Sequence, residues 1–402
     1  MKKLLLFFVF FITFSVQSQI FWTEYATAQP INDTGVSSIS IIDTNNTWLN
    51  MFWHCGMPPC ATTIRQYSKT TNGGTSWITG TIDLGLNSSD LLVGNISGIS
   101  STVAYASVYP IASTLGGIWK TADGGTTWTR QNAFNDTNSF ADLVHFWNAN
   151  EGVAVGNSVN GYFEVYTTLN GGNTWTRLMS TPALLPINTS ERICVNNFTV
   201  TDNTIWVATT SGRILKSSDK GATWVTMQSP IPEIGSGVLF EITQRFGQMA
   251  FTDQNGGLFI TFERNNASGI RLYKTSDGGG TWSEIMYTGY ARSYDISAIP
   301  GMPNAYVTVG EEYDGINTGS SFTVDGGLNW VDINSVDELV VQGAIVAMHD
   351  ADHGFAGGYS TTATEGGIFV WGGGAMLRQA HLNVSTFPGD KAVIASPNPT
   401  TG

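Results

Sequence analysis

Short runs of apolar and β-branched residues recur along the chain, separated by clusters of Gly, Asn, Asp and Ser. Apolar and polar positions alternate within these runs, which is typical of half-buried strands rather than amphipathic helices. One stretch predicts four consecutive strands, at 139–147, 152–156, 162–168 and 174–179. Similar quartets can be drawn before and after it. The pattern therefore predicts an all-β fold made of four-stranded units.

A Gly-rich motif that ends in Trp lies between the third and fourth strands of each unit, and it recurs about every 50 residues. Its Asp or Asn can accept bonds from the following backbone amides, its glycines accept positive φ, and its Trp can pack over the turn. Two of the units carry Asn in place of Asp, so we expect structural turns rather than calcium or catalytic sites. The motifs contain Asn72 and Trp77, Asp123 and Trp128, Asn170 and Trp175, Asp219 and Trp224, Asp277 and Trp282, and Asp325 and Trp330.

Six motifs predict more than six units, because the pattern continues past Trp330. Runs at 340–349, 354–359 and 367–371 look like three strands with no motif and no fourth strand, whereas 21–24 looks like a fourth strand without its predecessors. If the N-terminal strand completes the last unit, the ring closes and no exposed edge remains. We therefore predict a seven-bladed β-propeller, with six blades as the fallback.

The N-terminal 18 residues combine Lys2 and Lys3 with an apolar run at 4–14 and with aliphatic Val16 and small Ser18. This arrangement predicts a secretory signal peptide, and the run is shorter than the about 20 residues that span a bilayer. We expect a signal peptide at 1–18, a propeller at 19–378, and a linker with a short further segment at 379–402. A secreted or cell-surface protein without a transmembrane segment follows.

The chain is acidic, with a net charge of −13, although only 12% of its residues are charged. Nucleic acid is an unexpected partner for such a chain, because phosphate binding needs a basic face. An acidic surface also keeps a protein soluble. We expect no cofactor, since no phosphate-binding loop, Ser-His-Asp set or pair of zinc-binding histidines stands out.

Three cysteines are present. Cys55 and Cys60 flank a short loop, and in an oxidising compartment we expect them to form a disulfide. A metal site would need more ligands than the neighbouring His54 provides, so no metal is predicted. Cys194 is left over, and we expect it to be buried or free.

The Trp-ending motifs resemble the Asp-box, or BNR, repeats of sialidases, endoxyloglucanases, sortilin-type receptors and the photosystem II assembly factor propeller. The similarity extends over nearly all of residues 20–375 and implies the propeller fold. It implies little about activity, because one scaffold hosts many functions.

The residues at 396–402, Ser-Pro-Asn-Pro-Thr-Thr-Gly, resemble the beginning of the C-terminal sorting domain of the Bacteroidetes type IX secretion system. That resemblance implies export with the help of the type IX secretion machinery. A Pro-rich tail without a sorting role is the alternative interpretation.

A sialidase-like mechanism would need an arginine triad, a Tyr–Glu nucleophile pair and an Asp. The Phe-Arg-Ile-Pro-like motif of that family does not precede Asn72, and Arg65 is the one arginine in residues 20–67. A two-carboxylate glycosidase would instead need acidic side chains on facing loops. If the chain is a glycosidase, the candidates are Glu263, Glu311, Glu312 and Asp314.

These candidates share one predicted location. The loops between second and third strands lie on the rim opposite the Asp-box turns, which is where propellers usually bind ligands. Trp53, His54 and Tyr313 lie in the same set of loops and could provide stacking or polar contacts. We hypothesise a non-catalytic propeller that binds an extracellular glycan or protein. The alternative is a secreted glycoside hydrolase of endoxyloglucanase-like or sialidase-like kind.

Overall fold

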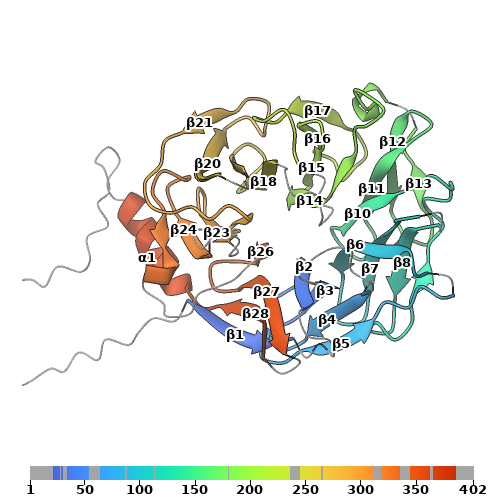
Figure 1. The fold of residues 1–402 in the computed structure, drawn as a ribbon, viewed down its shortest axis with the longest axis horizontal. Coiled ribbons are helices and arrows are strands. Elements are labelled where there is room, and N and C mark those ends of the chain that lie inside the picture. The colour runs from blue at the N-terminus through green and yellow to red at the C-terminus, as the bar shows by residue number, and fades with distance from the viewer. Residues whose placement is uncertain are drawn as a thin grey trace, which may run out of the picture.

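A computed structural model describes residues 21–27, 29, 34–53, 64–86, 88–112, 115–179, 181–235, 245–263, 266–310, 318–335, 345–362 and 365–385. The chain forms seven antiparallel blades around a central axis (Figure 1). The prediction of an all-β, seven-bladed propeller is therefore confirmed, and the six-bladed fallback is wrong.

The strands of each blade follow one another in sequence from the axis outward, except in the seventh, where the N-terminal strand is outermost. The first blade contains β2 (Thr34–Ile41), β3 (Thr47–Trp53), β4 (Gln66–Thr70) and β5 (Ile78–Thr81). The second contains β6 (Leu91–Gly98), β7 (Ala104–Pro110), β8 (Gly117–Thr121) and β9 (Thr129–Arg130). The third contains β10 (Ala141–Phe146), β11 (Gly152–Val159), β12 (Tyr162–Thr168) and β13 (Thr176–Arg177).

The remaining blades repeat this order. The fourth contains β14 (Ile193–Thr201), β15 (Thr204–Thr209), β16 (Arg213–Ser217) and β17 (Val225–Gln228). The fifth contains β18 (Arg245–Phe251), β19 (Gly257–Glu263), β20 (Asn266–Thr275) and β21 (Ser283–Ile285). The sixth contains β22 (Asp295–Ala298), β23 (Tyr306–Gly310), β24 (Gly319–Thr323) and β25 (Val331–Asp332), and the seventh contains β26 (Ile345–Met348), β27 (Gly354–Thr362), β28 (Glu365–Trp371) and β1 (Trp22–Ala26).

The N-terminal strand closes the ring, as the sequence predicted. β1 pairs antiparallel with β28, from Trp22 opposite Trp371 to Ala26 opposite Gly367. The Trp22 indole donates a hydrogen bond to Ser320 Oγ of the sixth blade at 2.9 Å, and its ring meets that of Trp371 edge-on. One strand thus completes the seventh blade and also joins it to the sixth.

A second contact reinforces this closure from the inside. The far end of β27 runs past the short β26 and pairs with β2 of the first blade, with Thr34 opposite Ser360 and Gly35 opposite Tyr359. The first and seventh blades therefore share a continuous hydrogen-bonded sheet.

A helix that the sequence analysis did not anticipate follows the last blade. This helix, α1 (Gly374–Ser385), buries Leu377 against the cluster that contains Phe21 and Trp22, and Arg378 binds both carboxylate oxygens of Asp352 at 2.8 and 2.7 Å. Figure 1 places it beside the sixth and seventh blades. Two one-turn 3-10 helices, η1 (Pro182–Leu184) and η2 (Ile333–Ser335), lie in connections between blades. Across the described residues, no helix combines the length and apolar character needed to cross a membrane.

Each Asp-box forms a closed polar turn. In the second blade, Asp123 Oδ1 accepts bonds from the Thr127 amide and the Thr121 hydroxyl, both at 2.9 Å. The Thr121 hydroxyl in turn accepts the Gly125 amide at 2.8 Å, and Gly125 has a φ of 94°, which a residue with a side chain rarely adopts. The same bonds recur around Asn72, Asn170, Asp219, Asp277 and Asp325.

The boxes also join neighbouring blades. Lys120 Nζ and Tyr105 Oη of the second blade both donate to Gly171 O in the box of the third, at 2.8 and 2.6 Å. Lys216 and Trp206 of the fourth blade contact Gly278 O of the fifth in the same way, at 3.2 and 2.8 Å. This rim therefore holds the ring together.

Replacing Trp224 with Ala should lower the free energy of unfolding by about 3 to 5 kcal/mol, as expected for a buried Trp. Its ring is only 7% exposed, packs in the cluster between the third and fourth blades, and donates to Gly221 O at 2.9 Å. Urea denaturation measures this loss. Val225→Ala is the matched control, because Val225 is 52% exposed and should cost about 1 kcal/mol or less. Equal losses in the two variants would contradict the packing role of the box tryptophans.

Candidate binding face

The propeller has two unequal rims. The Asp-box turns and the turns between first and second strands lie on one rim, which we call the box rim. The loops between second and third strands and most connections between blades lie on the other, which we call the open rim. The connection after β21 is an exception, because Thr288 pairs with Leu328 and Trp330 of the sixth Asp-box. A ligand that binds one rim therefore meets different segments from a ligand that binds the other.

Two of the residues that the sequence singled out for binding or catalysis are described by the structure. Trp53 is the last residue of β3 and Glu263 the last of β19, so both backbones reach the open rim. The other candidates, His54, Cys55, Cys60, Glu311, Glu312, Tyr313 and Asp314, lie outside the described residues. Their convergence on one site and the Cys55–Cys60 disulfide remain predictions.

The acidic residues of the box rim are occupied by their own turns. Hydrogen bonds from the Thr127 side chain and backbone lower the pKa of Asp123 to about 2, and those from Thr281 do the same for Asp277. A general acid must hold a proton near neutral pH, and these carboxylates do not. The box carboxylates therefore suit turn formation rather than acid catalysis.

Large apolar side chains are exposed on both rims, and those of the open rim include a group within one connection. On the box rim, Leu169 and Leu328 lie in box turns, and Ile78 and Val225 directly follow the tryptophans of their boxes. The open-rim loops expose Leu86, Ile111, Met179, Leu185 and Ile187. Exposed apolar groups that gather in one place are typical of interaction surfaces. The open rim is therefore the candidate binding face.

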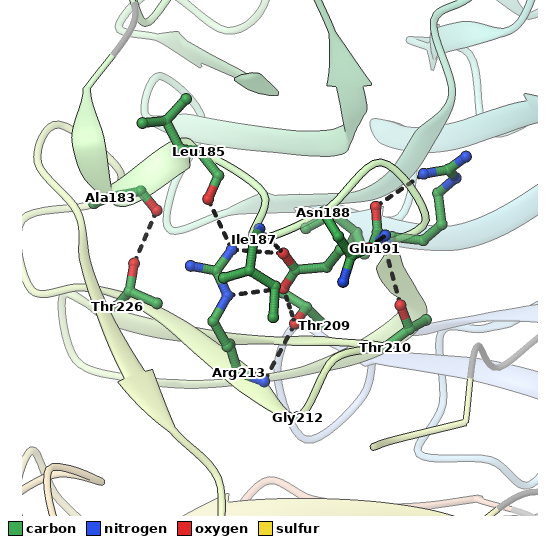
Figure 2. A network of polar contacts seen from close by, with 12 residues as sticks. Ala183, Leu185, Ile187, Asn188, Glu191, Thr209, Thr210, Gly212, Arg213 and Thr226 are labelled. Atoms are coloured by element: carbon green, nitrogen blue, oxygen red, sulfur yellow. Dashed lines mark hydrogen bonds and ion pairs between the residues drawn. The ribbon is translucent and has the colours of Figure 1, made fainter. Parts of the chain in front are cut away.

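The connection between the third and fourth blades carries the densest group of these side chains, and a buried ion pair fixes its shape (Figure 2). The Glu191 side chain is fully buried. Its Oε1 accepts bonds from Arg213 Nε at 2.8 Å and the Thr209 hydroxyl at 2.6 Å. Its Oε2 accepts Arg213 Nη2 and the Ile187 amide, both at 2.7 Å. Four donors thus satisfy one buried carboxylate.

The same arginine continues the network into the loop. Arg213 Nη2 also donates to Leu185 O at 2.8 Å, and the Thr226 hydroxyl donates to Ala183 O at 2.8 Å. Figure 2 shows the Leu185 carbonyl directed at Arg213 and its side chain directed away from the network. The blade-four strands β16 and β17 therefore hold the loop by its backbone and leave apolar side chains outside. Sequence reasoning missed this pair because its partners lie far apart in the chain.

Two further carboxylates near this rim also have partners within the fold. Glu164 lies 3.6 Å from Arg177 and accepts the Tyr166 hydroxyl at 3.3 Å, while burial raises the pKa of Glu164. Arg292 donates to Asp332 at 2.8 Å in the sixth blade. Both carboxylates are paired with arginines within the fold, and neither places an exposed carboxylate on the candidate face.

Polar side chains of the innermost strands form hydrogen bonds between successive blades near the axis. Asn95 of the second blade accepts the Val144 amide and donates to the Val144 carbonyl, both at 2.9 Å. Asp295 of the sixth blade occupies the corresponding place and accepts the Val346 amide at 2.8 Å. Burial raises the pKa of Asp295 to about 7, although the Val346 and Ile296 amides oppose the shift.

The stability of the protein should therefore fall as the pH rises from about 4 to above 7. The folded chain holds the Asp295 proton more tightly than the unfolded chain, so ionisation of this group favours unfolding by up to about 4 kcal/mol. Asp295→Asn removes the titration and keeps an acceptor for Val346. The difference in unfolding free energy between wild type and variant, measured from pH 4 to 8, isolates this group.

A difference that stays constant over that range would contradict the assignment. Asn95→Asp is the matched control. A carboxylate at that position would face the Val144 carbonyl that the amide nitrogen now contacts at 2.9 Å, so this variant should acquire a fall of the same sign.

One hydrogen bond crosses the centre of the ring, from the fourth blade to the first. Between Ile193 and Phe198 the innermost strand of the fourth blade bulges out of register, and Asn196 adopts a φ of 54°. Its side-chain Nδ2 donates to Ser37 O of the first blade at 2.7 Å. Cys194, within the bulge, is buried and free, as expected. The bulge links two blades that are not neighbours in the ring.

Comparison with known proteins places the chain by its fold. No protein-family profile matches the sequence, and no curated protein does. A structure of YCF48 bound to D1 peptide is 16% identical and superposes with a TM-score of 0.56 over 87% of this chain and 96% of that one. This chain has the same fold. YCF48 from Cyanidioschyzon merolae gives 15% identity and a TM-score of 0.56, covering 88% of this chain and 99% of that one.

An ancestral GH74 enzyme is also similar, with 15% identity and a TM-score of 0.52. The match covers 85% of this chain but 46% of the enzyme, so the chain spans less than half of that protein. At these identities the likeness concerns architecture alone. The predicted resemblance to Asp-box propellers is thus supported for the fold, and activity must be argued from the chain itself.

Proposed function

We propose that this chain is a non-catalytic propeller that binds a protein or glycan partner outside the cytoplasm through its open rim. The observation that carries the proposal is the set of exposed apolar side chains in the open-rim loops, Leu86, Ile111, Met179, Leu185 and Ile187, three of which lie in one connection. The box rim is occupied by contacts between blades, so the open rim is the surface left for a partner.

The comparisons give secondary support. The YCF48 structures match this chain over almost the whole length of both proteins, and one of them holds a peptide. Export through a type IX-like route belongs to the same proposal. It rests on the signal-like segment at 1–18 and the Pro-Asn-Pro segment near residue 398.

A secreted glycoside hydrolase is the second candidate. The GH74 similarity favours it, as does the predicted placement of Glu263, Glu311, Glu312 and Asp314 in loops of one rim. An enzyme of this class must bring two carboxylates within about 5 to 9.5 Å of each other. A binding module has no such requirement.

One paired experiment separates the two functions. The purified chain is applied to a glycan array and to a phage-displayed library of random twelve-residue peptides, and release of reducing ends is measured on the polysaccharides of the array. Binding without release supports the proposal. Release of reducing ends that is abolished by Glu311→Gln or Glu312→Gln would establish the hydrolase, and silence in both binding screens would overturn the binding function.

A further inference from the structure

We propose that the connection at 181–192 is the docking platform for an extended peptide that brings an apolar side chain onto Leu185 and Ile187 and a carboxylate to Arg192. This inference rests on the proposed function and makes it specific. It names the part of the open rim that is used, and it names the chemistry of the partner.

The platform is apolar and carries no aromatic ring. Ile187 is 61% exposed, Leu185 is 42% exposed and Met179 is 77% exposed, all within one short connection. The sequence from 179 to 192 contains neither Phe, Tyr, Trp nor His. Sugars are usually held by stacking on aromatic faces, whereas aliphatic side chains suit the aliphatic groups of a peptide. The surface therefore favours a peptide over a glycan.

The platform is also held in shape before any partner arrives. Arg213 and Glu191 are 11% and 0% exposed, and together they fix the backbone at Leu185 and Ile187. Leu184, between the exposed positions, is buried and anchors the 3-10 turn against the core. A loop that is already ordered loses less conformational entropy on binding, so its exposed side chains contribute more to affinity. Burying an ion pair beneath a solvent-exposed loop is consistent with such a role.

One charge at the edge of the platform is left to face a partner. Arg192 is exposed, and its guanidinium donates to the carbonyls of Thr189 and Glu191 at 2.8 and 3.0 Å. Among the described residues, no carboxylate lies within salt-bridge distance of Arg192. The Glu191 charge is compensated by Arg213, so the loop presents a net positive charge on a protein whose total is −13. An acidic residue of the peptide is the complementary group.

The geometry suits an extended strand rather than a helix. Leu185 has an extended backbone, with φ −75° and ψ 122°, and Ile187 follows it two residues later. Side chains two apart on an extended peptide can meet two such neighbours, with a third contact at Arg192. Three anchors within one connection define a short linear motif.

The test uses the peptides selected by phage display on the full chain. The affinity of the best synthetic peptide is measured by fluorescence polarisation for wild type, for the double variant Leu185→Ser/Ile187→Ser and for Arg192→Glu. We expect each variant to weaken binding by about tenfold or more. Arg192→Glu should also reverse the salt dependence of the affinity, because added salt screens the repulsion between the new carboxylate and that of the peptide. Replacing the acidic residue of the peptide with its amide should weaken binding to wild type but not to Arg192→Glu.

Leu169→Ser/Leu328→Ser is the matched control, because it removes two exposed leucines from the box rim, and it should change the affinity by less than about twofold. All of these positions are on the surface, so thermal melting checks that each variant is folded. A selected peptide that binds the open-rim variants as tightly as wild type would overturn the platform and leave the proposed binding function intact. Selection of no peptide, with glycans bound on the array, would overturn the platform in the same way, whereas silence in both screens would overturn the binding function itself.

Discussion

Removing residues 20–26, which include all of β1, should destabilise the entire propeller rather than one blade. β1 forms the outer strand of the seventh blade, and without it the outer edge of β28 loses its partner from Gly367 to Trp371. Trp22 also carries the contact with the sixth blade, so the single change Trp22→Ala should cost about 3 to 5 kcal/mol. Both effects are measured as shifts of the urea unfolding midpoint.

Cooperative loss distinguishes ring closure from local packing. If the strand closes the ring, the deletion variant should unfold in one transition that moves to much lower urea and is followed identically by fluorescence and circular dichroism. A deletion variant that melts like the parent would contradict closure by the N-terminal strand.

Arg213→Met should cost about 3 to 5 kcal/mol of stability, the second of the large effects. The change leaves the Glu191 carboxylate fully buried without the two guanidinium bonds that offset its desolvation. It also releases the Leu185 carbonyl, so the connection between the third and fourth blades should exchange its amide hydrogens faster. Chemical denaturation and hydrogen exchange measure the two consequences.

Two variants show whether burial causes this loss. Adding Glu191→Gln to Arg213→Met removes the orphaned charge and should recover part of the stability. Arg271→Met alters a pair with Glu284 whose members are 61% and 47% exposed, so it should cost about 1 kcal/mol or less. A loss at Arg271 that equals the loss at Arg213 would contradict the assignment to a buried charge.

The repeating part of the fold could be predicted from local pattern. Asp, Gly and Trp at fixed spacing specify a turn that bonds to itself, as at Asp123, and the strands on either side need alternating apolar positions. The predicted strands of the third blade match β10 to β13 in place, although the fourth, expected at 174–179, is paired at Thr176–Arg177 only. Ring closure could be inferred because the last blade lacked a fourth strand in the sequence pattern, whereas the N-terminus carried a strand without a blade of its own.

The irregular features depend on contacts that no local pattern reports. Helix α1 has a weak apolar face and is defined by the fit of Leu377 against the closing blade. The bulge of β14 depends on a carbonyl of the first blade, at Ser37. Such contacts join residues that are distant in sequence, so they become visible only when the ring is assembled.

For the candidate site, the sequence predicted which rim to consider but not the platform. Open-rim loops were identified from the order of strands and turns, which the structure preserves. The apolar run Ala183-Leu184-Leu185-Pro186-Ile187 was present in the sequence, yet nothing in it distinguishes buried Leu184 from exposed Leu185. That distinction depends on Arg213, which lies in a different strand.

The most direct test of the central claim is the hydrogen-exchange footprint of a bound partner, taken from either screen, on the full chain. Binding through the open rim predicts slower exchange in open-rim segments, with the largest change at 181–192 for a peptide, and unchanged exchange in the box turns. A footprint confined to the box rim, over turns such as 121–128 and 217–224, would contradict the account.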